Sequence, residues 1–83
     1  MDNVPYLNEA VANIVESLRK KSGYTQEQLA GFAKTSRSQI AQLEAGKRGV
    51  TLASLFWLAE SFNIPFLGFI RMIHEERARL QLK

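Results

Sequence analysis

Apolar residues recur along the chain at the three- and four-residue spacing of an α-helix rather than at the alternation of a β-strand. The first such series consists of Leu7, Val11, Ile14, Val15 and Leu18. Ser22-Gly23 follows it, and glycine readily takes the left-handed conformation that ends many helices. The pattern therefore predicts a first helix that begins near Leu7 and ends beside Gly23.

Two helix-start signals then lie eleven residues apart. Thr25 is followed three residues later by Gln28, a capping-box spacing in which the hydroxyl and the amide satisfy backbone N–H groups of the first helical turn. Ser36 and Gln39 repeat that spacing, and Gly46 marks the end of the helix that they begin. Because the two starts are so close, we expect a short helix, a tight turn and a second short helix.

The remainder of the chain predicts two more helices. Thr51 can cap a helix whose apolar face consists of Leu52, Leu55, Leu58, Ala59 and Phe62. Asn63 closes that helix, and Pro65 suits the first turn of a fifth one. The apolar face of the fifth helix consists of Phe66, Phe69, Ile70, Ile73 and Leu80. We expect the charged tail from residue 75 onward to fray, and we expect an all-α fold of five helices.

The amino-acid composition indicates a globular protein and excludes several other classes. With 83 residues, 46% of them apolar and 23% charged, the chain suits one globular domain. The absence of Cys excludes disulfides, thiol catalysis and thiolate metal sites, and it fits a reducing compartment. The longest apolar run, residues 64–70, is far shorter than the roughly 20 residues that span a bilayer, and no secretion-signal pattern begins the chain. We expect a single cytoplasmic domain over residues 1–83, with no membrane partner.

The net charge of +3 is too small to indicate a partner, but its distribution is uneven. Residues 19–48 contain seven basic and two acidic residues, a net charge of +5, whereas the rest of the chain carries −2. Lys20 and Lys21 within this stretch are expected to be a solvated helix end, with contact to DNA phosphate as the alternative. The positive charge gathers around the predicted third helix, where it can attract nucleic acid.

The third predicted helix has a small, polar outer face. Ile40 and Leu43 define its buried side, and the residues opposite them are Ser38, Ala41, Gln42 and Ala45. Arg37 projects from the first turn, and no acidic residue lies near the centre of this face. Small side chains permit close approach to the major groove of DNA, and Arg and Gln can form hydrogen bonds with base edges.

Two stretches of the sequence resemble a known family. Residues 25–30, Thr-Gln-Glu-Gln-Leu-Ala, and residues 36–48, Ser-Arg-Ser-Gln-Ile-Ala-Gln-Leu-Glu-Ala-Gly-Lys-Arg, resemble the helix-turn-helix of the phage repressor/Cro-like (XRE) family. The resemblance covers about residues 7–69. It implies a five-helix, lambda-repressor-like bundle whose third helix enters the major groove of double-stranded DNA, usually as a homodimer on a near-palindromic operator.

The resemblance also assigns roles to individual positions. The base-contacting positions are Arg37, Ser38 and Gln42, of which Ser38 could instead contact phosphate. The positions that contact the DNA backbone are Gln26, Gln39, Lys47 and Arg48. Gln26 lies at a helix N-terminus, which favours phosphate. Arg19 and Glu44 match a structural pair that ties the first helix to the end of the third, although Arg19 could also contact DNA.

Three positions depart from the pattern of that family. Lys34 stands where relatives usually have the glycine of the turn, and Gly49-Val50 replaces a frequent Asn-Pro. Gly31 lies inside the second predicted helix and should cost about 1 kcal/mol relative to Ala. The turn must therefore accept a side chain at position 34, and the basic loop is expected to be looser than in relatives.

Large apolar side chains predict an interface between two copies of the chain. The expected seam lies on a C-terminal dimerisation helix within residues 65–83, with Trp57 or Phe66 at its edge. Its members are Trp57, Phe66, Phe69, Ile70 and Ile73. A domain this small has a limited core, which leaves apolar side chains for an interface, although Phe32 and Trp57 could instead cover the domain's own surface.

The sequence offers no enzyme or metal site. His74-Glu75 begins like the zinc motif HExxH, but Ala78 stands at the second ligand position. We expect no cofactor and no catalytic residue. The expected function is sequence-specific transcription regulation by a DNA-binding homodimer that blocks or recruits RNA polymerase, in a chain similar in size to restriction–modification controller proteins. The alternative is an antitoxin, or another protein-binding module of a toxin–antitoxin pair.

Overall fold

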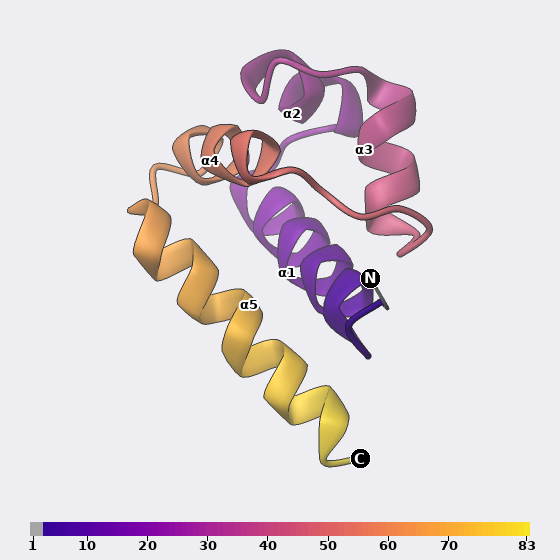
Figure 1. The fold of residues 1–83 in the computed structure, drawn as a ribbon. Coiled ribbons are helices and arrows are strands. Elements are labelled where there is room, and N and C mark those ends of the chain that lie inside the picture. Colours follow the sequence, from indigo (N-terminus) through magenta and orange to yellow (C-terminus); the bar gives the residue numbers. More distant parts are fainter. Residues whose placement is uncertain (1–2) are drawn as a thin grey trace.

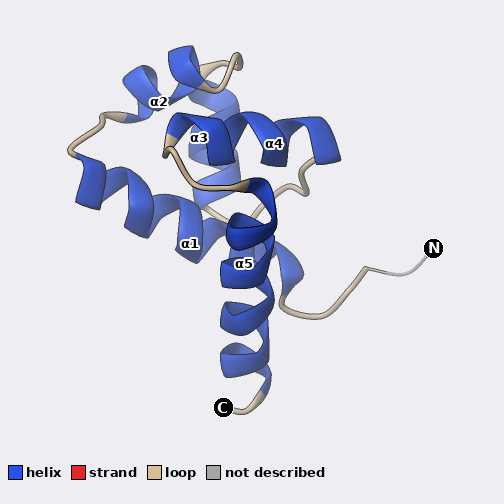
Figure 2. Ribbon diagram, turned by 90° about the vertical axis from the view of Figure 1, so that its left-hand side faces the viewer, coloured by secondary structure: helices blue, strands red, loops and turns tan. Residues whose placement is uncertain are grey.

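Five α-helices and their short connections make up residues 3–83, the part of the chain that the computed structural model describes (Figure 1). The helices are α1 (Leu7–Ser22), α2 (Gln26–Phe32), α3 (Arg37–Glu44), α4 (Leu52–Ser61) and α5 (Phe66–Gln81). These described residues contain no strand (Figure 2). The predicted all-α class is confirmed.

The two long helices, α1 and α5, pack against each other, and the three short helices gather around one end of this pair (Figures 1 and 2). α3 packs on α1 and α2, and α4 packs on α2 and α5. No single helix within residues 3–83 is long and apolar enough to cross a membrane. α4 and α5 together reach the necessary length and composition, but they meet at a bend of 106°.

Every helix contributes one of the five largest fully buried side chains. These side chains are Val15, Leu29, Ile40, Leu58 and Phe69. Each predicted apolar face therefore contributes to one core, but Leu52, which the spacing placed on the apolar face of the fourth helix, is 70% exposed. Because Phe69 of α5 is completely buried, α5 cannot leave the bundle without exposing a large aromatic ring to water.

Side chains at the helix starts satisfy the first backbone N–H groups. The Thr25 hydroxyl accepts a hydrogen bond from the Gln28 N–H at 3.0 Å, and the Gln28 side chain accepts one from the Thr25 N–H at 2.9 Å, which completes the predicted capping box. Ser36 accepts from the Gln39 N–H at 3.2 Å. The reciprocal half of that second box is absent, because the Gln39 side chain accepts from the Thr35 hydroxyl instead. The expectation of two equal capping boxes was therefore wrong for the second.

Four of the helices end in the same local arrangement. A residue with left-handed φ follows each helix, and the next N–H donates to the carbonyl five positions earlier, at 2.9–3.1 Å. The left-handed residues are Gly23, Lys34, Gly46 and Asn63. Glycine and asparagine tolerate this conformation well, whereas a residue such as Lys34 is strained by about 1–2 kcal/mol. The predicted ends at Gly23, Gly46 and Asn63 agree with the structure.

The charged C-terminal segment does not fray, contrary to the expectation from the sequence. α5 remains helical to Gln81, and Leu80 is buried with 7% exposure. Arg77 donates through Nε to the carbonyl of Pro5 at 2.8 Å, and Glu76 accepts from Asn13 of α1 at 2.8 Å. The charged residues that indicated fraying from composition alone have partners on the N-terminal segment and on α1.

Candidate nucleic-acid interface

α3 presents a polar face to solvent and an apolar face to the core. Ile40 and Leu43 are 2% and 6% exposed, as the periodicity predicts. The side chains of Arg37, Ser38 and Gln42 are all exposed, and Ala41 beside them is half-buried. The structure thus brings the three expected base-contacting residues onto one accessible face of one helix.

An ion pair holds the end of α3 against α1. Arg19 donates from Nε to Glu44 Oε2 at 2.7 Å and from Nη2 to Glu44 Oε1 at 3.1 Å. The Glu44 carboxylate raises the pKa of Arg19, chiefly by accepting these hydrogen bonds. The third donor of the guanidinium, Nη1, reaches the carbonyl of Tyr24 at 2.9 Å and so braces the turn between α1 and α2. The pair expected from the sequence is present and joins three segments of the bundle.

Gln26 takes part in the same network. Its side-chain amide donates to Glu44 Oε1 at 3.1 Å, so that one buried carboxylate, 3% exposed, holds both Arg19 and the first residue of α2. This contact connects the start of α2 to the end of α3. The sequence did not indicate it, because the family resemblance assigned Gln26 only to phosphate.

In the turn between α2 and α3, Lys34 stands where relatives usually have glycine, and its side chain packs against Trp57 of α4. Lys34 has φ 57°, the left-handed conformation, and its Nζ lies 5.0 Å from the centre of the Trp57 ring. A cation over an indole face is attracted to the ring by about 0.5–1 kcal/mol at an exposed site. This contact offsets part of the backbone strain at Lys34. The lysine that replaces the usual glycine and the Trp57 ring of α4 are thus parts of one arrangement.

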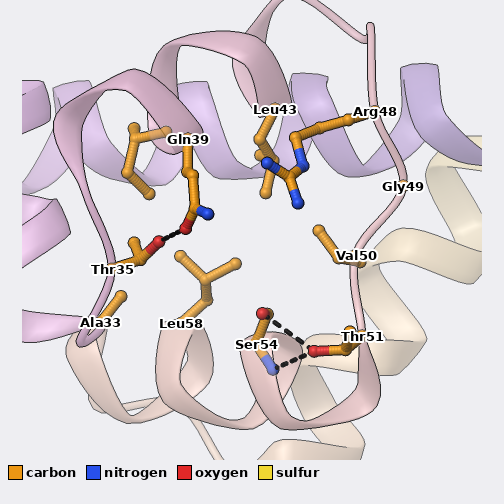
Figure 3. Close-up of a pocket in the computed structure, with 11 residues that line it drawn as sticks. Ala33, Thr35, Gln39, Leu43, Arg48, Gly49, Val50, Thr51, Ser54 and Leu58 are labelled. Atoms are coloured by element: carbon orange, nitrogen blue, oxygen red, sulfur yellow. Dashed lines mark hydrogen bonds between the residues drawn. The ribbon is translucent and has the colours of Figure 1, made fainter.

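The loop between α3 and α4 carries two exposed basic residues beside a small cavity. The cavity measures about 50 Å³ and lies between α3, α4 and this loop. Figure 3 shows the Arg48 guanidinium extending over the cavity and Gln39 directed toward Thr35. Lys47 is exposed. Of the four expected backbone contacts, Gln26 and Gln39 therefore have partners within the domain, whereas Lys47 and Arg48 lie at the surface.

Three basic residues on α3 and the loop after it form no ion pair with the described residues. Within residues 3–83, the ion pairs are Arg19–Glu44, Lys20–Glu16 and Arg79–Glu76. Arg37, Lys47 and Arg48 belong to none of them and are exposed. Their charges are available to the phosphate backbone of a nucleic acid.

The structure corrects the expected seam between two copies. Phe69 and Ile73 are 0% and 5% exposed and belong to the core of a single chain, so they cannot form a surface of contact. Trp57 is 37% exposed, and Phe66 and Ile70 are half-buried. On α4 and α5 the apolar side chains most exposed to solvent are Leu52, Phe56 and Leu67, at 70%, 41% and 78%.

We call Leu52, Phe56, Trp57, Phe66 and Leu67 the α4–α5 apolar surface; four of these side chains are exposed and Phe66 is half-buried. Leu52 and Phe56 are one helical turn apart, and the Phe56 ring lies 5.4 Å from that of Trp57 and 5.8 Å from that of Phe66. A signal for it was present in the sequence. α4 has apolar residues on all sides and a single charge, Glu60, which is typical of a helix that is covered on more than one face.

A metal site was not expected, and the described residues contain no group of three His, Cys, Asp or Glu side chains able to hold an ion. His74 lies exposed on α5.

Comparison with known families gives this geometry a context. Residues 15–69, more than half of the chain, match the sequence profile of a family described as helix-turn-helix. The chain belongs to this helix-turn-helix family. The XRE-type resemblance of residues 25–30 and 36–48 is thereby confirmed, and the family consists of DNA-binding transcriptional regulators, which are not enzymes.

Several relatives are regulators by name. The competence pilus inhibition repressor of Acinetobacter baylyi is 47% identical over 53 residues, which are 64% of this chain and 48% of that protein. The transcriptional repressor RghR of Bacillus subtilis is 34% identical over 82 residues, 90% of this chain and 61% of that protein. Control protein C.SmaI of Serratia marcescens is 37% identical over 57 residues, 69% of this chain and 68% of that protein. The chain therefore spans about half to three fifths of the first two relatives.

Solved structures share the fold. ClgR, the clp gene regulator of Corynebacterium glutamicum, aligns with a TM-score of 0.83 at 22% identity, over 94% of this chain and 83% of that chain. The restriction–modification controller protein C.Esp1396I, solved as a tetramer with its natural 35 base-pair operator, aligns with a TM-score of 0.79 at 25% identity, over 90% of this chain and 99% of that chain. The five-helix arrangement is thus that of helix-turn-helix regulators.

Proposed function

We propose that this protein is a sequence-specific transcriptional regulator that binds a near-palindromic operator as a homodimer. The observation that carries the proposal is the outer face of α3, on which Arg37, Ser38 and Gln42 are exposed together with no acidic residue among them. Arg can contact guanine and Gln can contact adenine through paired hydrogen bonds in the major groove.

The DNA backbone is contacted at both sides of this helix. Lys47 and Arg48 follow α3 in an exposed loop without ion-pair partners and approach one phosphate strand. Gln26 and Gln39 lie at the starts of α2 and α3, where helix N-termini favour phosphate. Glu44 holds the Gln26 amide at 3.1 Å, so in this proposal the Arg19–Glu44 pair also positions Gln26 at the DNA surface.

The homodimer forms through the α4–α5 apolar surface. Leu52, Phe56 and Leu67 supply its most exposed part. Pairing these surfaces across a two-fold axis removes apolar area from water, which favours association. Two α3 helices related in this way reach half-sites about 34 Å apart, one turn of B-DNA. Binding at such a site near a promoter blocks or recruits RNA polymerase.

A second function is supported by the same apolar surface. An antitoxin or other protein-binding module would cover Leu52, Phe56 and Leu67 with a partner protein rather than with a second copy. A reading frame for a toxin or a restriction enzyme beside this one would favour that interpretation or the controller interpretation, respectively.

Selection from random duplex DNA tests the leading proposal. Purified full-length protein is incubated with a random library, and bound sequences are recovered and aligned. The expected result is an enriched motif with two inverted half-sites about one helical turn apart. Recovery of an unenriched library would contradict sequence-specific binding, and a single asymmetric half-site would contradict the homodimer.

A further inference from the structure

A second, larger cavity lies on another side of the molecule, away from the outer face of α3. It has a volume of about 470 Å³, is open to solvent on one side, and is lined by the N-terminal segment, α1, the loop before α4, and α5. Its apolar walls include Leu7, Val11, Val50, Leu55, Ile70 and Ile73. Sites for small organic ligands measure about 300–1,000 Å³ and have mainly apolar walls, so this cavity has the size and lining of such a site.

The polar groups in the cavity are cationic or neutral. Arg77 and His74, one helical turn apart on α5, share it with Asn8 of α1. None of the described residues that line it is Asp or Glu. The Nε of Arg77 donates to the Pro5 carbonyl, and Arg77 forms no ion pair within residues 3–83, so its Nη groups can bind an anion. Apolar walls, with one guanidinium that pairs with no carboxylate among residues 3–83, complement an anion of single charge with an apolar body.

The cavity also adjoins the loop that carries the basic residues. Gly49 and Val50 form part of its wall and directly follow Lys47 and Arg48. Gly49 lies beside α1, where a Cβ added to it would be in ordinary contact with Asn8 Oδ1 at 3.5 Å. A ligand in the cavity would contact α1, α5 and this loop together. Contact with Gly49 and Val50 gives a bound ligand a direct way to alter the position of the loop relative to α3.

We infer that this cavity binds a small carboxylate with an apolar body, whose carboxylate is held by Arg77, and that its occupancy changes the affinity for DNA. The first part of this inference, ligand binding, depends only on the cavity. The second part, the effect on DNA affinity (the regulatory half), rests on the proposed function.

Decanoate below its micelle concentration is the probe, with decanol as the uncharged analogue of the same chain length. Titration of isotope-labelled full-length protein, followed by amide chemical shifts, should move the signals of Leu7, Val50 and Arg77. Decanoate should bind at least about tenfold more tightly than decanol, because only the carboxylate gains charge-assisted hydrogen bonds. Equal binding of the two, no binding, or shifts centred on the α4–α5 apolar surface would overturn the assignment.

Three variants sharpen the test. Arg77→Gln should weaken decanoate binding at least about tenfold, and Arg71→Gln, an exposed arginine of α5 outside the cavity, should leave it unchanged. Because Arg77→Gln also loses the contact with Pro5, Leu7→Trp serves as a second variant that fills the cavity and keeps every charge; it should abolish binding. Decanoate that binds Leu7→Trp as well as the wild type would show that the cavity is not the site.

DNA binding is then measured on a sequence recovered by selection. Decanoate should change the Kd for that DNA with the wild type and not with Leu7→Trp. Protein that binds decanoate but selects no DNA would refute the proposed function and leave the ligand site standing. Protein that binds both, with a Kd for DNA that decanoate does not change, would refute the regulatory half of the inference.

Discussion

Arg19 and Glu44, 25 residues apart in the sequence, form a two-pronged ion pair with N–O distances of 2.7 and 3.1 Å, in which Glu44 is 3% exposed and Arg19 13% exposed. Removing one partner from a buried pair leaves a buried charge without compensation, at a cost of about 3–5 kcal/mol. We expect Arg19→Ala to lower the free energy of unfolding by about 3 kcal/mol, the lower end of that range, because Arg19 is partly exposed. Urea denaturation measures the loss.

The chain contains a matched control for this prediction. Lys20 and Glu16 form an exposed pair on the same helix at 3.5 Å, with 66% and 46% exposure. Such pairs contribute about 0–1 kcal/mol, so Lys20→Ala should have little effect. Equal losses for Arg19→Ala and Lys20→Ala would mean that the Arg19–Glu44 pair does not brace the fold.

Acid should weaken the contact between α1 and α5 through Glu76. Hydrogen bonds from Arg79, the larger cause, and from Asn13, the smaller one, lower the pKa of Glu76 to about 2. A carboxylate with a lowered pKa in the folded state stabilises the fold above its unfolded pKa, and this stabilisation is lost as the pH falls from about 4.5 toward 2. Between these values the stability of the wild type should decline more steeply than that of Glu76→Gln. Glu75→Gln, at an exposed neighbour, should follow the wild type, and identical slopes for all three proteins would contradict the assignment.

The contact between Lys34 and Trp57 should appear as an energetic coupling. Lys34→Gly relieves the left-handed strain but loses the cation–π contact, whereas in a Trp57→Leu background it only relieves the strain. The substitution should therefore be more stabilising in that background by about 0.5–1 kcal/mol. A double-mutant cycle of urea denaturation curves, followed by circular dichroism, measures this difference. Additive effects, within about 0.3 kcal/mol, would show that the two side chains do not interact.

Base-reading and phosphate-binding residues should respond differently to DNA sequence and salt. Arg37→Ala should lose about 1–3 kcal/mol on the selected sequence, relax specificity at one base pair, and change binding to random DNA little. Lys47→Ala and Arg48→Ala should weaken binding to all sequences and reduce the salt slope by about one each. If Arg37→Ala lost the same binding free energy on selected and on random DNA, Arg37 would be a phosphate contact. If neither Lys47→Ala nor Arg48→Ala changed the salt dependence of binding, the loop between α3 and α4 would not contact DNA. Lys21→Ala, at the solvated end of α1, is the charge-matched control.

Self-association should depend on the exposed apolar side chains and not on the buried ones. Phe56→Asp and Leu67→Asp should shift sedimenting dimers to monomers while the fold is retained, because both side chains face solvent in one chain. Leu82→Asp, at an equally exposed leucine outside the α4–α5 apolar surface, should leave the dimer intact. Phe69→Asp should unfold the chain, since it places a charge where a fully buried ring packs. A wild type that sediments as a monomer at high micromolar concentration would contradict the proposed seam.

Local signals in the sequence predicted the helices and the orientation of α3. Thr25, Ser36 and Thr51 cap helices because their hydroxyls accept hydrogen bonds from N–H groups three residues on. Gly23 and Gly46 end helices because they readily take left-handed φ. Ile40 and Leu43 define the inner face of α3 because neighbouring positions on a helix recur every three to four residues. Each of these effects depends on residues within about one or two helical turns, so a single sequence contains all the information required.

Only the tertiary structure decided which apolar residues of α4 and α5 are exposed to solvent and which are buried in the core. Both helices carry apolar side chains on more than one face, so periodicity could not separate buried Phe69 and Ile73 from exposed Leu67. It also decided the contacts between distant segments, including Arg77 with the Pro5 carbonyl, 72 residues away, and Lys34 with Trp57. Composition made the C-terminal segment look solvated, but α1 and the N-terminal segment provide partners for its charges. Such contacts depend on how the helices pack in space, which local spacing along the chain does not encode.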